Sequence, residues 1–133
     1  MARKYHEASS KLDPNNALAL NNLAYLMSET NGDLDIALTY ATHAKQRLPE
    51  HTEINDTLGW IYLKKNLTDQ ALDTFRNLVT KAPKNPTFHY HYAMALMQKG
   101  DRESAKKECL TALSDNPNKP LDAEIRQLMA KVS

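Results

Sequence analysis

Cysteine and glycine are scarce in this chain, and their scarcity excludes several kinds of fold and site. Cys109 is the only cysteine, so the sequence offers neither an internal disulfide nor a metal cage built from cysteines. Three glycines and six prolines in 133 residues are too few for a turn-rich all-β fold. No phosphate-binding loop, dinucleotide-binding motif or serine nucleophile elbow occurs either.

Charge of one sign and long apolar runs are also missing. The 17 Lys and Arg residues nearly balance the 16 Asp and Glu residues, which leaves a formal net charge of +1. Nucleic-acid binding needs clustered basic residues, and this balance gives no sign of them. No apolar run approaches the length of about 18 residues that a membrane helix needs, and the N-terminus lacks the apolar stretch of a signal peptide. The compartment stays open between the cytoplasm and a periplasmic or envelope-associated location.

What the sequence does contain is an internal repeat of 34 residues. Pro49, Pro83 and Pro117 are spaced by this interval. Apolar residues recur at spacings of three and four along two stretches of each repeat, which predicts two helices per repeat. The expected divisions are the second helix of a truncated repeat in 1–16, complete repeats in 17–51, 52–85 and 86–119, and a C-terminal capping helix in 120–133.

Short turns separate the predicted helices. Asn85 is expected to cap a helix that begins at Pro86, because proline suits the first helical position. Asn66 and Gly100 tolerate the left-handed backbone that ends a helix. Asp33 and Thr68 are expected to cap the helices that follow their turns.

The recurring positions resemble the tetratricopeptide repeat family. The signature is carried in the middle repeat by Leu58, Gly59, Tyr62, Ala71, Phe75 and Pro83. The last repeat departs from it with Ala93, Leu96 and Cys109. The resemblance implies an all-α, right-handed superhelix of about three repeats with flanking helices. It also implies a concave groove, lined by the first helix of each repeat, that binds a protein or peptide.

The stretch from Asp56 to Tyr62, with 86–97, is similar to the C-terminal repeat arrays of bacterial envelope-associated proteins. These include the large repeat proteins that accompany exosortase and exopolysaccharide systems. This narrower resemblance implies a bacterial, envelope-associated parent protein.

Groove side chains are expected from the first helices by the family register. They are Leu18, Asn21, Tyr25 and Glu29, then Glu53, Asp56, Trp60 and Lys64, then Tyr90, Met94, Met97 and Gln98. Tyr25, Trp60 and Met94 occupy equivalent positions, and Tyr25, Trp60 and Tyr90 are the expected anchors, since aromatic residues dominate binding hot spots. The alternative is that they only pack against the neighbouring helix. Glu53 and Asp56 favour a basic or amide-rich ligand, unless they are merely solvated.

Catalytic, metal and cofactor sites are not expected. His89 and His91 lie two residues apart, so on a helix they point in different directions and cannot easily share a metal ion. We expect His89 to pack in a half-buried position and His91 to be exposed. Cys109 stands where the family places a buried apolar residue, and no histidine is in register to activate it. The chain is therefore predicted to be a non-catalytic binding scaffold.

The N-terminal segment predicts an incomplete array. Residues 5–16 resemble the second helix of a repeat whose first helix is missing, so further repeats are expected upstream in a longer parent protein. The apolar face of this unpaired helix could pair with another copy and form a homodimer. The alternative function is accordingly a structural spacer or self-association module.

Overall fold

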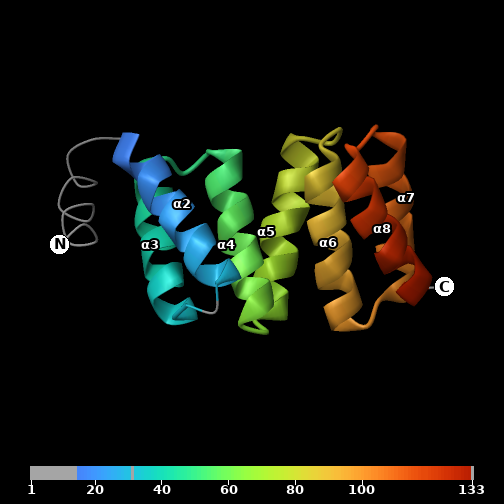
Figure 1. Ribbon diagram of the computed structural model, residues 1–133, viewed down its shortest axis with the longest axis horizontal. Coiled ribbons are helices and arrows are strands. Elements are labelled where there is room, and N and C mark those ends of the chain that lie inside the picture. The colour runs from blue at the N-terminus through green and yellow to red at the C-terminus, as the bar shows by residue number, and fades with distance from the viewer. Residues whose placement is uncertain (1–14, 31, 133) are drawn as a thin grey trace. The chain divides into compact units, whose positions relative to one another are not determined.

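The computed structural model describes residues 15–30 and 32–132 of the chain, and within them every regular element is an α-helix (Figure 1). Their contacts divide the chain into two compact units, with the division between Lys65 and Asn66. The predicted second helix in 1–16, and dimerisation through it, lie almost wholly outside the described residues. In the described residues, no helix combines the length and apolar character needed to cross a membrane.

The first unit contains three helices: α2 (Asn15–Glu29), α3 (Leu34–Arg47) and α4 (Thr52–Lys64). They contact one another in all three combinations, and successive helices run in opposite directions (Figure 1). Small side chains recur on the faces that meet, which lets the helices approach closely. The core of this unit consists of Ala17, Leu20, Ala24, Met27, Ala37, Tyr40, Ala41, Ala44, Ile54, Leu58 and Ile61.

The second unit contains four helices: α5 (Thr68–Lys81), α6 (Pro86–Lys99), α7 (Arg102–Ser114) and α8 (Lys119–Val132). Each contacts the next one, and α6 also contacts α8 (Figure 1). Phe75, Leu78 and Ile125 are its largest apolar side chains that are almost wholly buried. Residues 119–132 form α8, and the division between the units falls inside the predicted repeat 52–85.

Most of the predicted helix ends are confirmed. Asn85 caps α6, because its Oδ1 accepts hydrogen bonds from the amides of Thr87 (2.9 Å) and Phe88 (3.3 Å). Asp33 caps α3 in the same way. Gly100 adopts a positive φ of 96° at the end of α6. The prediction for Thr68 is wrong: Leu67 precedes α5 without a side-chain cap, and the Thr68 hydroxyl instead donates to Gln98 Oε1 at 2.6 Å.

One ion pair recurs in the two units with the period of the repeat. Lys65, after the last turn of α4, pairs with Asp35 in the first turn of α3. Thirty-four residues later, Lys99 Nζ at the end of α6 lies 3.0 Å from Asp69 Oδ1 in the first turn of α5. Both pairs are at least partly exposed, so each contributes at most about 1 kcal/mol. Their recurrence ties the end of each first helix to the start of the second helix before it.

Candidate functional site

The residues predicted for the groove lie on α2 and α4 of the first unit and on α6 of the second. Most of them reach the surface. Leu18 is 37% exposed and Tyr25 is 44% exposed. Glu53, Lys64 and Gln98 are exposed, and Asp56, Trp60, Tyr90, Met94 and Met97 are half-buried.

Asn21 is the exception, because it is only 5% exposed. It follows Ala17 by four residues and precedes Ala24 by three, and both alanines are fully buried. Residues at these spacings share one helix face, so Asn21 belongs to the face of α2 that packs against the unit. Its Oδ1 has no hydrogen-bond partner among the described residues. The interpretation of Asn21 as a groove side chain is therefore wrong.

Glu29 joins the two aromatic residues of the first unit. Trp60 Nε1 donates a hydrogen bond to Glu29 Oε2 at 2.9 Å, and the Tyr25 hydroxyl donates to Glu29 Oε1 at 3.4 Å. Lys64 Nζ forms an ion pair with Glu29 Oε2 at 3.1 Å. A single carboxylate thus holds three side chains from α2 and α4, and we call Tyr25, Glu29, Trp60 and Lys64 the Glu29 cluster.

Lys64 also orients the indole directly. Its Nζ lies 5.3 Å from the centroid of the Trp60 ring, within the range of a cation–π contact. The indole is therefore held at its N–H by Glu29 and at its ring by Lys64. A hollow of ≈390 Å³ adjoins this cluster and is lined by Ser28, Gly32, Leu34 and Lys64.

The sequence predictions do not include the contacts that Glu29 makes with these side chains, although the sequence holds a signal for them. The first repeat, 17–51, is one residue longer than the period of 34. Glu29 and Lys64, which are 35 residues apart, therefore occupy equivalent positions of adjacent first helices. Tyr25 and Trp60 are equivalent in the same register. Opposite charges at equivalent positions of neighbouring helices are candidates for an ion pair, and here they form one.

The contacts of Glu29 set its protonation. Burial acts to raise the pKa of Glu29, but hydrogen bonds from Trp60 and Lys64, together with the Lys64 charge, outweigh it and lower the pKa below 4.5. The carboxylate is therefore ionised at neutral pH and accepts all three contacts.

Acid is expected to break the hydrogen bonds and the ion pair of the Glu29 cluster. Because the pKa of Glu29 is lower in the folded chain, its contribution to stability is complete above pH 4.5 and is lost as the pH falls through the folded value. We expect the indole N–H resonance of Trp60 to move upfield over that acidic range, as its hydrogen bond to the carboxylate weakens. A pH titration followed by NMR measures this, with Glu29→Gln as the variant in which the transition disappears. An indole resonance with the same titration in both proteins would contradict the assignment.

In the second unit, Tyr90, Met94 and Met97 form a half-buried row on α6. Burial raises the pKa of the Tyr90 hydroxyl, and the negative charge of Glu124 on α8 adds to the effect. The Tyr90 ring lies 5.8 Å from that of His91. His91 is itself half-buried, with its ring 5.7 Å from Phe75, so the expectation of an exposed His91 is wrong.

His89 is more deeply buried than expected and is held by polar contacts. Its Nδ1 lies 2.6 Å from Glu108 Oε1, and its Nε2 lies 2.6 Å from the carbonyl oxygen of Pro83. Asp115 Oδ2 is 3.9 Å from the same Nε2. His89 therefore connects α6 to α7 and to the turn that follows α5.

Cys109 is placed as a packing residue in the part of the chain that the structure describes. Cys109 is fully buried, and burial raises the pKa of its thiol to about 11, with the nearby Glu108 carboxylate adding to the shift. A thiol in this state is not a nucleophile at neutral pH. Among the described residues, no group of three or more His, Cys, Asp or Glu side chains is placed to hold a metal ion.

Comparison with known families relates the repeats to characterised sequences. Residues 62–132 match a family model described as "Tetratricopeptide repeat", and residues 7–39 match a second model with the same description. The chain is 30% identical over 81 residues to the TPR repeat-containing thioredoxin TTL4 of Arabidopsis thaliana, covering 61% of this chain and 12% of that protein. It is 34% identical over 89 residues to the BBSome complex member BBS4 of Bos taurus, covering 62% of this chain and 17% of that protein. The chain thus spans less than a fifth of either relative.

Among solved structures, the chain is similar to the type III secretion chaperone SycD of Yersinia enterocolitica in complex with a peptide of the translocator YopD. The TM-score is 0.76 at 19% sequence identity, and the alignment covers 89% of this chain and 92% of SycD. At this identity the likeness concerns the fold, and it confirms the predicted all-α repeat class.

Proposed function

This chain belongs to the tetratricopeptide repeat family, and from that premise we propose that it is a non-catalytic scaffold that binds a segment of another protein. The observation that carries the proposal is the Glu29 cluster. It places two aromatic side chains, Tyr25 and Trp60, on neighbouring first helices and holds both through one carboxylate. The first helices are the expected ligand surface of such repeats.

The contacts of Trp60 suit a binding residue. Glu29 occupies the indole N–H and Lys64 lies over the ring, so the side chain is oriented before any ligand arrives. A residue that is already ordered loses little conformational entropy on binding. Tyr25 is nearly half exposed and offers a second aromatic surface. We therefore assign the main ligand contacts in the first unit to Tyr25 and Trp60, with Leu18 and Lys64 beside them.

The kind of ligand follows from the fold and from the nearby charges. SycD was solved with a bound peptide, and the likeness in fold supports a peptide segment as the ligand here. Glu53 and Asp56 lie on α4 within two turns of Trp60. Carboxylates at the rim attract cationic partners and select against anionic ones, so we propose a basic or amide-rich segment.

The row on α6 provides the proposed contacts in the second unit. Tyr90, Met94 and Met97 combine an aromatic ring with flexible thioether side chains, which adapt to ligands of different shape. In this proposal they contact a ligand within the second unit. An envelope-associated bacterial parent protein is a further part of the proposal, supported by the resemblance of the stretch from Asp56 to Tyr62.

Selection of peptides from a phage-displayed random library tests the function. We expect peptides enriched in basic and amide side chains to bind the chain, and Trp60→Ala to weaken their binding about tenfold or more, as for a hot-spot residue. Fluorescence anisotropy with the selected peptides measures the effect. Leu26→Ala is the matched control, because Leu26 lies on α2, is 58% exposed and is outside the cluster.

Two results would contradict the proposal. One is equal binding by wild type and Trp60→Ala when circular dichroism shows both to be folded. The other is a library that yields no specific binders at all. That second outcome, with concentration-dependent association in sedimentation, would instead favour the self-association module.

A further inference from the structure

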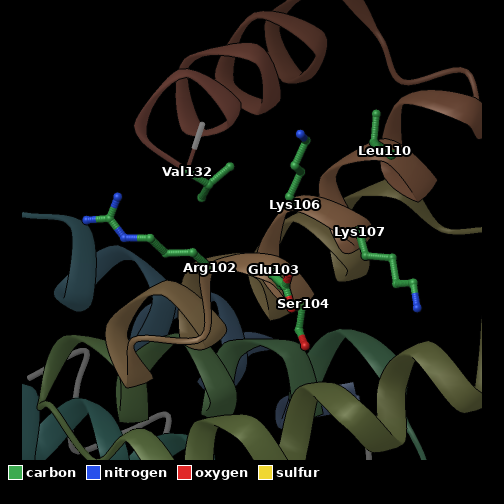
Figure 2. A pocket seen from close by; sticks show the side chains of 7 residues that line it. All are labelled: Arg102, Glu103, Ser104, Lys106, Lys107, Leu110 and Val132. Carbon is green, nitrogen blue, oxygen red and sulfur yellow. The ribbon is translucent and has the colours of Figure 1, made fainter.

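A second surface belongs to the second unit, where α7 meets the end of α8. It is a hollow of ≈640 Å³ that is lined by Arg102, Glu103, Ser104, Lys106, Lys107, Leu110 and Val132 (Figure 2). Lys106 and Leu110 point from α7 to the side on which Val132 lies, Lys106 is drawn between Leu110 and Val132, and Arg102 lies at one end (Figure 2). Its volume falls within the range of about 300–1,000 Å³ that is typical of ligand pockets.

One repeat earlier, contacts between helices close the equivalent place. The hollow occurs where those contacts are missing. Between α5 and α6, Thr68 donates to Gln98 at 2.6 Å. Thirty-four residues later these two positions hold Arg102 and Val132, which cannot form that hydrogen bond. Arg102 Nη1 instead donates to the backbone carbonyl of Lys131 at 3.4 Å.

The recurring lysine–aspartate pair is lost at the same place. Asp69 pairs with Lys99 in the preceding repeat. The position equivalent to Asp69 is Glu103, but the position equivalent to Lys99 is Ser133 in the sequence. At this end of α7 and α8, the sequence therefore lacks the lysine and the aspartate that pair in the preceding repeats.

The side chains of α7 at this surface also depart from those of the earlier repeats. Leu38 is a partly buried apolar residue and Leu72 is a buried one. The equivalent position of the last repeat holds Lys106. Leu110 is 50% exposed, one of the four large apolar side chains that are exposed among the described residues. A lysine at a position that elsewhere packs apolar surface favours a charged partner over a purely apolar one.

The charges of the hollow are largely uncompensated. Three cations and one carboxylate line it. Within the described part of the chain, neither Lys106 nor Lys107 forms an ion pair. Leu110 and Val132 supply the apolar part of this lining, and the basic side chains Lys106 and Lys107 have no acidic partner among the described residues.

We propose that this hollow binds an acidic peptide segment that packs one aliphatic or aromatic side chain against Leu110. Carboxylates of the same segment then pair with Arg102 and Lys106. Opposite charge at the rim gives orientation and a faster approach, while burial of the apolar side chain gives affinity. The partner chemistry is opposite to that of the basic or amide-rich segment proposed for α2 and α4, so the two surfaces select different ligands.

A peptide fits the hollow better than a nucleic acid or a membrane. Nucleic acids and anionic bilayers are bound by extended basic surfaces. Here Glu103 lies among the cations, and the net charge of the whole chain is only +1. The apolar part of the lining consists of only two side chains, Leu110 and Val132, which suits one apolar side chain of a peptide.

Fluorescence anisotropy with the complete chain tests the proposal. The probe is a short fluorescein-labelled peptide of glutamates with one central leucine. We expect Lys106→Glu to weaken its binding about tenfold, because attraction becomes repulsion, and Leu110→Ser to weaken it about threefold. Lys84→Glu is the matched control: it makes the same charge change at an exposed residue outside the hollow. Binding should also weaken as salt is raised.

Further probes and variants separate this surface from the alternatives. A peptide with serine in place of the leucine should bind less tightly, and one with lysines in place of the glutamates should not bind. Trp60→Ala should bind the acidic peptide as wild type does, so this test succeeds or fails independently of the first proposal. Equal binding by Lys106→Glu and Lys84→Glu, no binding to wild type, or Lys106-dependent binding to phosphatidylserine vesicles without peptide binding would each overturn it.

Discussion

Replacement of Phe75 by alanine is expected to destabilise the chain by about 3–5 kcal/mol. Phe75 is fully buried on α5, and its ring lies 5.7 Å from His91 on α6. Truncation removes the transfer free energy of the ring and leaves a cavity that rigid helices fill only in part. Urea unfolding followed by circular dichroism measures the loss, and the midpoint should fall while the α-helical signal of the folded state is kept.

Leu110→Ala is the control for the Phe75 substitution. Leu110 is half exposed on α7, so its truncation should change stability by no more than about 0.5 kcal/mol. A loss below 1 kcal/mol for Phe75→Ala, or equal losses for the two variants, would show that the ring is not part of a packed core.

Replacement of His89 by alanine should cost about 3 kcal/mol. The substitution leaves the Glu108 carboxylate and the Pro83 carbonyl without their partner, and the Glu108 side chain is only 21% exposed. A charged group that stays partly buried after its partner is removed has a high cost. Thermal unfolding of the complete chain measures it. His43→Ala is the matched control, because His43 is exposed on α3.

A double-mutant cycle separates the contact with Glu108 from packing of the imidazole. If the contact with Glu108 carries the loss, His89→Ala combined with Glu108→Ala should cost at least 1 kcal/mol less than the sum of the single variants. Strict additivity would show that His89 acts only by filling space.

The secondary structure was predictable because its signals are local. Asn85 and Pro86 lie next to each other in the sequence, and the cap that they form depends only on the first turn of α6. Gly100 ends the same helix because glycine tolerates a positive φ. Thr68 shows the limit of such rules, since its hydroxyl donates a hydrogen bond to Gln98, thirty residues away, and does not cap α5.

The candidate site was predictable by position but not by contact. The register placed Tyr25 and Trp60 on the surface of the first helices, where the structure has them. It did not distinguish Asn21 from the exposed groove residues, although Asn21, one helical turn from Tyr25, lies on the buried face. It relates Glu29 to Lys64 as opposite charges at equivalent positions, but it does not show that Trp60 also contacts Glu29, because that contact depends on the approach of α4 to α2.

The sequence by itself determined that this chain is an all-helical tetratricopeptide array, because periodic apolar residues and caps act within a few turns of one helix. Tertiary structure alone decided how the polar side chains are paired. Glu29 meets Trp60, and His89 meets Glu108, only when separate helices pack at one depth and angle. The open hollow beside Lys106 likewise exists because two helices meet without the hydrogen bond and ion pair that close the preceding repeat. Such pairings depend on side-chain positions to within a few tenths of an ångström, and a repeat period does not specify them.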